Sequence, residues 1–361
     1  MDKQTNLLDL DLQSMETYFV NMGEKSLRAS QTLKWVYQHG VTDFSEMTTL
    51  SKALREKLST IAHIILPKVI SEQISEDGTR KWLLQLDNDN SIETVFIPER
   101  ERGTLCVSSQ VGCALDCSFC YTGKQGFNRN LSTGEIIGQL LIANQALGVY
   151  QHKNRTISNV VMMGMGEPLL NFDNVVSAMR LMTEDHAFGL SRKRVTLSTS
   201  GLVPAIDKLA ETSDVSLAIS LHATNDELRN ILVPINKSFP LAKLMEACKR
   251  YAKAQSGDTI TFEYVMLDGV NDSAAEARML VKLVHGIPAK VNLIPFNLFP
   301  GTDYRCSSTA AINRFRDILI KGGLFAVTRK TRGEDIDAAC GQLVGKVMAR
   351  AKKHQHQLNG K

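Results

Sequence analysis

The chain has 361 residues, of which 43% are hydrophobic and 22% are charged. These values are ordinary for a folded globular protein and exclude disordered and fibrous classes. The net charge of +4 permits nucleic-acid binding without arguing for it. No window approaches the length of a membrane-spanning helix and the first residues lack a signal-peptide pattern, so we expect a cytoplasmic protein with no membrane association. The length predicts a barrel-sized domain with a smaller appendage.

The first 62 residues carry the spacing of amphipathic helices. Apolar residues recur at helical intervals in two runs, which end at Gly23 and Gly40, and a third helix is predicted over residues 51–62. We therefore expect a small helical domain over residues 1–65.

Residues 66–100 change to a strand pattern. Strands are predicted over residues 68–75, 79–87 and 91–97. Asp77 and Gly78, between the first two strands, are a strong hairpin-turn signal. This segment is therefore predicted to be a β-hairpin extension.

Strands and helices alternate over residues 101–345. The predicted strands are 104–109, 159–163, 194–199, 215–220, 259–266 and 290–296, with a further one at 324–328. Between them lie amphipathic segments such as 132–147, which Ser132 and Glu135 begin with a capping box. Six such units predict an α/β fold, a parallel sheet curled into a partial (β/α)6 barrel of the TIM type, with functional residues at the carboxyl ends of the strands. Residues 346–361 form a basic carboxyl-terminal tail.

Seven cysteines, four of them between residues 106 and 120, fit a reducing compartment better than a disulfide framework. Cys113, Cys117 and Cys120 stand at gaps of four and three residues and can turn their thiolates toward one point. A structural zinc site needs four ligands, and no fourth Cys or His lies in this loop. The spacing suits a [4Fe-4S] cluster with one iron left open, which can chelate S-adenosylmethionine and cleave it to a 5′-deoxyadenosyl radical. The alternative is that the three cysteines bind no metal and lie in a buried or oxidised loop.

Polar residues at the ends of the later strands are candidates for binding that cofactor. The run Gly164-Met165-Gly166-Glu167-Pro168 places small residues and a carboxylate just past a strand, where they can approach an amino group. Ser198, Ser220 and His222 follow further strands and can bond a ribose and a carboxylate. Taken alone, the glycine run is an ordinary turn and His222 is a structural histidine.

Three basic runs are candidates for phosphate contacts. They lie at residues 192–194, 329–332 and 350–353. Each can equally be a solvated surface.

These motifs together resemble the RlmN family of radical S-adenosylmethionine enzymes, dual-specificity methyltransferases of adenine carbon 2 in large-subunit ribosomal RNA and in transfer RNA. The resemblance runs from about residue 92 to residue 343, and the amino-terminal helices resemble the family's accessory RNA-binding region. Besides the cysteine triplet and the Gly-Met-Gly-Glu-Pro run, its motifs are Ile92-Glu93-Thr94-Val95, Cys106-Val107-Ser108-Ser109-Gln110, Gly126-Phe127-Asn128-Arg129-Asn130-Leu131, Ser220-Leu221-His222 and Arg332-Gly333-Glu334-Asp335-Ile336-Asp337-Ala338-Ala339-Cys340-Gly341. The related Cfr enzymes, which methylate carbon 8, typically carry alanine where this chain has Pro168, so the chain looks like the carbon 2 branch.

The resemblance implies a [4Fe-4S] cluster on Cys113, Cys117 and Cys120, and two molecules of S-adenosylmethionine per turnover. It also implies a set of residues that bind S-adenosylmethionine. These are Gly166, Glu167, Ser198, Ser220, Leu221, His222 and Asn297.

The resemblance further implies a methyl-carrying cysteine. Carbon 2 of adenine has no nucleophilic lone pair, so it cannot attack a sulfonium methyl directly and a radical route is needed. Cys340 takes a methyl group from one cofactor molecule, the deoxyadenosyl radical from a second removes a hydrogen from it, and the thiomethylene radical adds to the ring. Glu93 then accepts the ring proton, and Cys106 attacks the sulfur of Cys340, which releases the product and leaves a transient disulfide.

The implied partners are 23S ribosomal RNA in its peptidyl-transferase region, the adenosine beside the anticodon of some transfer RNAs, and an electron donor such as flavodoxin; a monomer is expected. Without the resemblance, the favoured interpretation is a strand-edge surface carboxylate for Glu93 and an inert buried strand residue for Cys106. The competing functions are carbon 8 methylation and, from another class, a zinc-containing RNA-binding protein.

Overall fold

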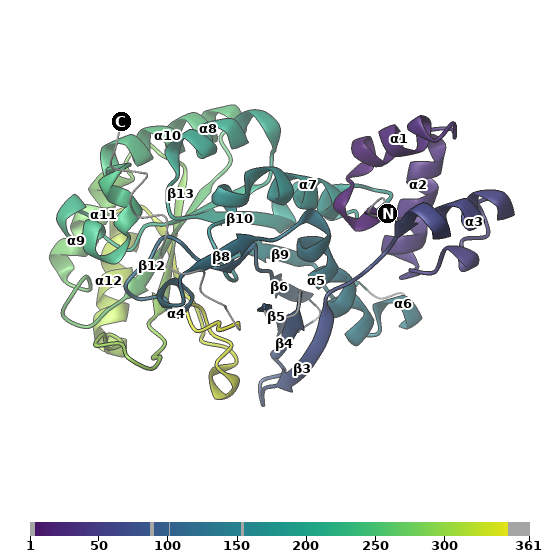
Figure 1. The fold of residues 1–361 in the computed structure, drawn as a ribbon. Coiled ribbons are helices and arrows are strands. Elements are labelled where there is room, and N and C mark those ends of the chain that lie inside the picture. The colour runs from purple at the N-terminus through teal and green to yellow at the C-terminus, as the bar shows by residue number, and fades with distance from the viewer. Residues whose placement is uncertain (1–3, 87–89, 101, 153–154, 346–361) are drawn as a thin grey trace.

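The computed structural model describes residues 4–86, 90–100, 102–152 and 155–345. A large twisted sheet forms its centre, helices cover the outside of the sheet, and the amino-terminal helices lie at one end (Figure 1). Nowhere in the described ranges is a helix both long and apolar enough to cross a bilayer. The basic tail predicted over residues 346–361, including the run at 350–353, lies outside the described residues.

The three predicted amino-terminal helices are confirmed. They are α1 (Leu12–Asn21), α2 (Leu27–Leu33), which continues as a π-helical segment (Lys34–Gln38), and α3 (Lys52–Ile61). The side chains of Asp11 and Ser51 cap α1 and α3 by accepting hydrogen bonds from the N–H groups of Ser14 and Leu54.

A segment before α1 joins these helices to the barrel. β1 (Thr5–Asn6) pairs with β2 (Ala62–His63), directly after α3. The carboxylate of Asp9 accepts a hydrogen bond from the N–H of Gly134 at 2.8 Å, at the start of α5 (Thr133–Ala146). The carboxylate of Asp11 lies 3.3 Å from the guanidinium of Arg180. The amino-terminal segment therefore supports the barrel as well as its own helices.

In the described residues, ten strands form one sheet in the order β14-β13-β12-β11-β10-β9-β6-β5-β4-β3. The strands from β6 to β14 pair in parallel, and β3 to β6 pair antiparallel. Their bounds are β3 Lys68–Ile74, β4 Arg80–Gln85, β5 Ser91–Glu99, β6 Arg102–Cys106, β9 Asn159–Met162, β10 Val195–Thr199, β11 Ser216–Ser220, β12 Ile260–Met266, β13 Ala289–Pro295 and β14 Phe325–Thr328. The predicted strands are present, although β6 ends earlier than expected. The hairpin continues the barrel sheet instead of forming a separate layer.

Helices connect the parallel strands and pack on the outer face of the sheet (Figure 1). Besides α5 they are α6 Val149–His152, α7 Phe172–Thr183, α8 Val203–Thr212, α9 Asp226–Leu232, α10 Leu241–Ala254, α11 Ala274–Leu283 and α12 Thr309–Lys321. The short α4 (Tyr121–Lys124) instead follows the cysteine loop, where Tyr121 bonds to Gly341. The capping box of Ser132 and Glu135 begins α5 as predicted. Because β14 forms one edge of the sheet and does not pair with β6 in the described residues, the barrel is open, which confirms the predicted partial barrel.

Two strands around the cysteine loop were not predicted. β7 (Gln110–Gly112) pairs antiparallel with β8 (Phe127–Asn130). They are short and polar, so they lack the alternation that marks a strand in sequence. Their pairing brings together the two ends of the loop between them, where the N–H of Cys113 donates to the carbonyl of Gly126 at 2.8 Å.

Candidate active site

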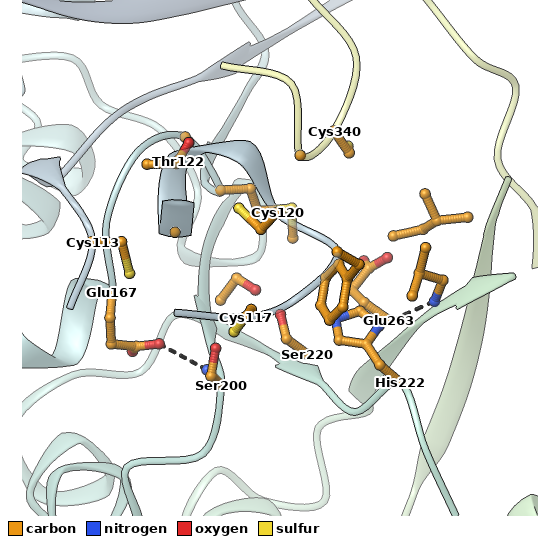
Figure 2. A pocket seen from close by; sticks show the side chains of 18 of the residues that line it. Cys113, Cys117, Cys120, Thr122, Glu167, Ser200, Ser220, His222, Glu263 and Cys340 are labelled. Atoms are coloured by element: carbon orange, nitrogen blue, oxygen red, sulfur yellow. Dashed lines mark hydrogen bonds between the residues drawn. The ribbon is translucent and has the colours of Figure 1, made fainter. Parts of the chain in front are cut away.

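The carboxyl ends of the parallel strands surround a cavity of about 160 Å³, named here the barrel cavity (Figure 2). It collects most of the site residues expected from sequence. They are Cys113, Cys117, Cys120, Gly166, Glu167, Ser198, Ser220, His222, Asn297 and Cys340. The parallel topology explains this convergence, because the loops that follow successive strands meet at one end of a barrel.

The three loop cysteines line the same wall of the barrel cavity (Figure 2). The pKa of the Cys113 thiol is raised to about 12, chiefly by burial and also by the neighbouring Cys120. The pKa values of Cys117 and Cys120 are also raised, again chiefly by burial. Three buried thiols that repel one another as thiolates need a compensating positive charge, which bound metal supplies.

The number of these thiols distinguishes a cluster from a structural zinc site. A structural zinc ion takes four protein ligands, and no fourth Cys or His lies in the loop of residues 112–126. Three thiols on one wall match the ligand set of a [4Fe-4S] cluster with one open iron.

The glycine run has a packing role beside Glu167. A Cβ on Gly164 would lie 2.7 Å from the backbone of Val107, and one on Gly166, whose φ is +99°, would lie 2.5 Å from the side chain of Gln110. The glycines thus let this loop pack on the segment after β6. Burial raises the pKa of Glu167, while hydrogen bonds from backbone N–H groups lower it; the bond from Ser200 measures 2.8 Å (Figure 2). These hydrogen bonds fix the orientation of the Glu167 carboxylate at the barrel cavity.

His222 is held as a neutral ring. Its Nδ1 accepts a hydrogen bond from the N–H of Val265 at 3.0 Å, so the ring proton lies on Nε2. Its pKa is lowered to about 3, chiefly by burial and also by the charge of Arg229. The ring of Phe119 packs against it edge-on at 4.5 Å between centroids. His222 therefore offers a fixed N–H donor at the cavity.

Two expected cofactor-binding residues are placed differently from the others. The side chain of Leu221 is fully buried in the core, and its backbone N–H donates to the carbonyl of Glu263 at 3.0 Å. The Nδ2 of Asn297 donates to the carbonyl of Cys340 at 3.2 Å. Leu221 thus supports the cavity from behind, and Asn297 holds the segment that carries Cys340.

A second cavity of about 290 Å³, named here the side cavity, adjoins the first. Cys106 and Cys340 both line it, and Cys120, Arg329 and Cys340 line both cavities. The described structure therefore brings Cys106 and Cys340, 234 positions apart in the chain, to the wall of one cavity.

Residues 340–345 are tied to α4, directly after the cysteine loop. The N–H of Tyr121 donates to the carbonyl of Gly341 at 2.8 Å, and the hydroxyl of Thr122 donates to the carbonyl of Leu343 at 2.8 Å. These bonds fix the position of Cys340 relative to the three loop cysteines, and Figure 2 shows it above Cys120.

The thiol of Cys106 and the carboxylate of Glu93 are both shielded from solvent. The pKa of Cys106 is raised to about 12, chiefly by burial and also by Cys340, while Arg329 acts to lower it. The positive charge of Arg329 thus favours the Cys106 thiolate, but burial outweighs it. Glu93 lies on β5, where burial raises its pKa while the N–H of Val344, at 2.7 Å, and the ammonium of Lys81, at 3.2 Å, lower it.

The two basic runs within the described residues differ in place. Residues 329–332 line the side cavity. The run at 192–194 precedes β10, at the opposite end of the barrel, where Arg192 pairs with Asp214 and Lys193 with Asp258. The structure thus separates two runs that sequence could not distinguish.

Several residues in or near the two cavities could not be assigned from the sequence. In the sequence, Arg329 is one residue of a basic run. Lys81 and Glu263 lie inside predicted strands, and no motif marks either as a functional residue. Glu263 is buried on β12 at the barrel cavity, 3.9 Å from Arg329. Of these residues, Ser200 could have been predicted, because it is a polar residue directly after the strand β10.

Comparison with known proteins agrees with this geometry. Residues 5–64 match the family model described as the Ribosomal RNA large subunit methyltransferase N-terminal domain, and residues 107–280 match that of the Radical SAM superfamily. A radical SAM methyltransferase from Sphaerobacter thermophilus is 43% identical, with 94% of this chain and 99% of that chain covered and a TM-score of 0.87. The chain belongs to the radical S-adenosylmethionine methyltransferases, with an amino-terminal domain of the RlmN type.

The cofactors follow from membership of this family. A radical S-adenosylmethionine methyltransferase uses a [4Fe-4S] cluster and S-adenosylmethionine, and it needs a reductant. The three-cysteine wall of the barrel cavity fits that cluster. More distant is SuiB of Streptococcus suis bound to S-adenosylmethionine, at 14% identity over 68% of this chain and 57% of that chain with a TM-score of 0.47, which adds nothing to the assignment.

Proposed function

We propose that this radical methyltransferase adds a methyl group to carbon 2 of adenosine in 23S ribosomal RNA and in transfer RNA, through a methylated Cys340 and a covalent enzyme-RNA adduct. The observation that carries the proposal is the position of Cys340, in the wall of both the barrel cavity and the side cavity. A methyl group carried there can meet the cofactor on one side and a target base on the other.

In the barrel cavity, Cys113, Cys117 and Cys120 would hold the cluster, which when bound supplies the electron that cleaves S-adenosylmethionine and can take one electron back. The polar residues opposite would bind the cofactor. Glu167 offers a buried carboxylate to a cationic amino group, Ser198 and Ser220 offer hydroxyls, and His222 offers its Nε2–H. Because His222 stays neutral, its donor is present throughout the physiological pH range.

In the side cavity, Cys340 would carry the methyl group and, after hydrogen removal, add to the adenine ring. Glu93 would accept the ring proton. Cys106 would then attack the Cys340 sulfur, forming a disulfide as the carbon–sulfur bond breaks and the product takes up a proton. A thiol whose pKa burial raises needs help to ionise, and Arg329 is the positive group that favours the thiolate.

RNA recognition is supported by charge and by the amino-terminal domain. The run at 329–332 surrounds the side cavity, where phosphates flanking the target base would lie. The family model over residues 5–64 is named for a ribosomal RNA methyltransferase. A flavodoxin-like protein is the proposed electron donor.

Nucleoside mass spectrometry tests the proposal directly. Ribosomal and transfer RNA from cells with and without the gene should differ in 2-methyladenosine. Appearance of 8-methyladenosine instead would favour carbon 8 methylation, which Pro168, at the start of a 3-10 helix after Glu167, argues against by resemblance. RNA unchanged in both nucleosides would contradict the function.

A further inference from the structure

We propose that Lys81 is a positioning residue, which holds Glu93 and the segment carrying Cys340 together so that the ring proton has an ionised acceptor beside the methyl carrier. This inference rests on the proposed function. It assigns a role to β4 of the hairpin, for which the sequence predicted only an extension of the barrel.

The sheet register places Lys81 beneath the side cavity. Lys81 lies opposite Val95 on β5, and Val95 lies opposite Cys106 on β6. Directly opposed residues of neighbouring strands point to the same face of a sheet. Val95 and Cys106 line the side cavity, so Lys81 belongs to the same face. Glu93, two residues before Val95, shares it as well.

Lys81 is a buried cation with two partners on different parts of the chain. Its ammonium lies 3.2 Å from the carboxylate of Glu93, and their side chains are 8% and 9% exposed. It also donates a hydrogen bond to the carbonyl of Asp337 at 3.3 Å, three residues before Cys340. The other oxygen of Glu93 accepts from the N–H of Val344 at 2.7 Å, four residues after Cys340. The ion pair therefore holds the Cys340 segment on both sides.

The hairpin turn adds contacts to the same segment. The hydroxyl of Ser75 donates to the carboxylate of Asp335, and the carboxylate of Asp77 accepts from the N–H of Gly333 at 3.3 Å. Gly333 has a φ of +61° and packs against Thr79, where a Cβ would lie 2.9 Å from the methyl carbon. These contacts bring the segment to the hairpin, and Lys81 links it to the proton acceptor.

Proton transfer explains why a charged partner is needed. After the thiomethylene radical has added, the ring proton passes to the Glu93 carboxylate and its electron pair stays in the ring, which becomes aromatic again. This leaves one surplus electron, which the cluster that Cys113, Cys117 and Cys120 would hold can accept. Burial and the charge of Asp337 raise the pKa of Glu93, whereas Lys81 and the Val344 N–H lower it. The ammonium of Lys81 therefore favours the ionised carboxylate.

The test compares Lys81→Met, which keeps length without charge, with Lys81→Arg, Glu93→Gln and the double variant Lys81→Met/Glu93→Gln. Conversion of the enzyme-RNA adduct to released product is followed from pH 5.5 to 9. Release requires ionised Glu93, so its rate rises with pH to a plateau. Lys81→Met should shift this rise to higher pH by about one unit, so that the rate of product release at a pH below the plateau falls roughly tenfold. Lys81→Arg should leave it near the original pH.

Two further measurements separate positioning from folding. Methylation of Cys340 in the purified protein should be near normal in Lys81→Met, because that step transfers no ring proton. Thermal unfolding of the protein without RNA should show Lys81→Met less stable than the double variant, since the single change leaves a buried charge unpaired. Lys249→Met, which breaks an exposed pair with Glu246, is the matched control and should change none of these.

The outcomes distinguish the two hypotheses. Normal product release by Glu93→Gln would overturn the proton-acceptor role and the inference with it. If Glu93→Gln blocks release while Lys81→Met lowers the rate equally at every pH, Lys81 serves the fold alone and only this inference fails. If Lys81→Met releases product at the normal rate and with the normal pH dependence, the inference about Lys81 is overturned as well.

Discussion

The barrel cavity and the side cavity adjoin but are built in different ways. The barrel cavity is lined mainly by residues that directly follow successive parallel strands, such as Glu167 after β9 and His222 after β11. The side cavity joins antiparallel strands to a distant carboxyl-terminal segment; the hydrogen bond from Lys81 to Asp337 spans 256 positions and that from Val344 to Glu93 spans 251.

The two halves of the proposed reaction therefore depend on separate structural supports. The barrel topology alone assembles the first cavity, so its residues recur at strand ends. The second exists only when residues 332–345 dock between the hairpin and α4. Variants should therefore affect cofactor cleavage and product release independently.

The largest expected effect is from Cys117→Ala in the barrel cavity. Losing one of three thiol ligands should abolish cluster binding, because no fourth Cys or His lies in the loop to replace it. Iron content and visible absorbance of anaerobically purified protein should fall to background together with all turnover. Cys306→Ala, at an exposed cysteine, is the matched control. A full iron complement with normal activity would contradict the ligand assignment.

Next in size is Cys106→Ala in the side cavity. Cleavage of S-adenosylmethionine and methylation of Cys340 should continue, while product release falls to background and a covalent enzyme-RNA species accumulates on a denaturing gel. Replacing Cys340 as well should remove that species, since no carrier remains. Release of methylated adenosine at the normal rate without an adduct would show that Cys106 is a core residue.

His222 provides a smaller test, through pH. Its pKa is about 3 in the folded protein and roughly 6.5 when unfolded, so below pH 6.5 the unfolded chain binds a proton that the folded one does not. Stability should fall by about 2 kcal/mol between pH 6.5 and 5 from this group alone.

His222→Asn should remove that part of the pH dependence, measured from urea-unfolding midpoints at each pH. Asparagine suits the position because it tolerates the φ of +61° and can accept the Val265 hydrogen bond. Replacing exposed His285 in the same way should leave the pH dependence as in the original protein. An unchanged slope in His222→Asn would mean that His222 is not held neutral.

The smallest effect is expected for Lys330→Gln at the side cavity. Loss of one phosphate contact should weaken RNA binding several-fold and reduce the salt-dependence slope by about 1. Lys193→Gln, in the basic run at the far end of the barrel, is the matched control and should bind as the original does. Equal weakening by both changes would mean that RNA covers both ends of the barrel.

The elements that surround the barrel cavity, and the residues expected to line it, could be predicted from neighbouring residues in the chain. Strand periodicity, the capping box of Ser132 and Glu135, and the Asp77-Gly78 turn are local signals, and each appears in the structure. The cysteine spacing is local as well, so three ligands and an open site could be predicted from nine consecutive residues. The strand-end positions of Ser198, Ser220 and His222 then follow from parallel topology alone.

The construction of the side cavity could not be predicted from any local pattern. Lys81 and Glu93 carry no local signal, because a charged residue within a strand resembles any solvated edge until its partner is known. The basic runs at 192–194 and 329–332 are alike in composition, and only folding sends one to acidic partners and the other to the cavity. The physical reason is that short-range preferences are written in neighbouring residues, whereas burial and charge pairing depend on segments that meet only after the chain has closed on itself.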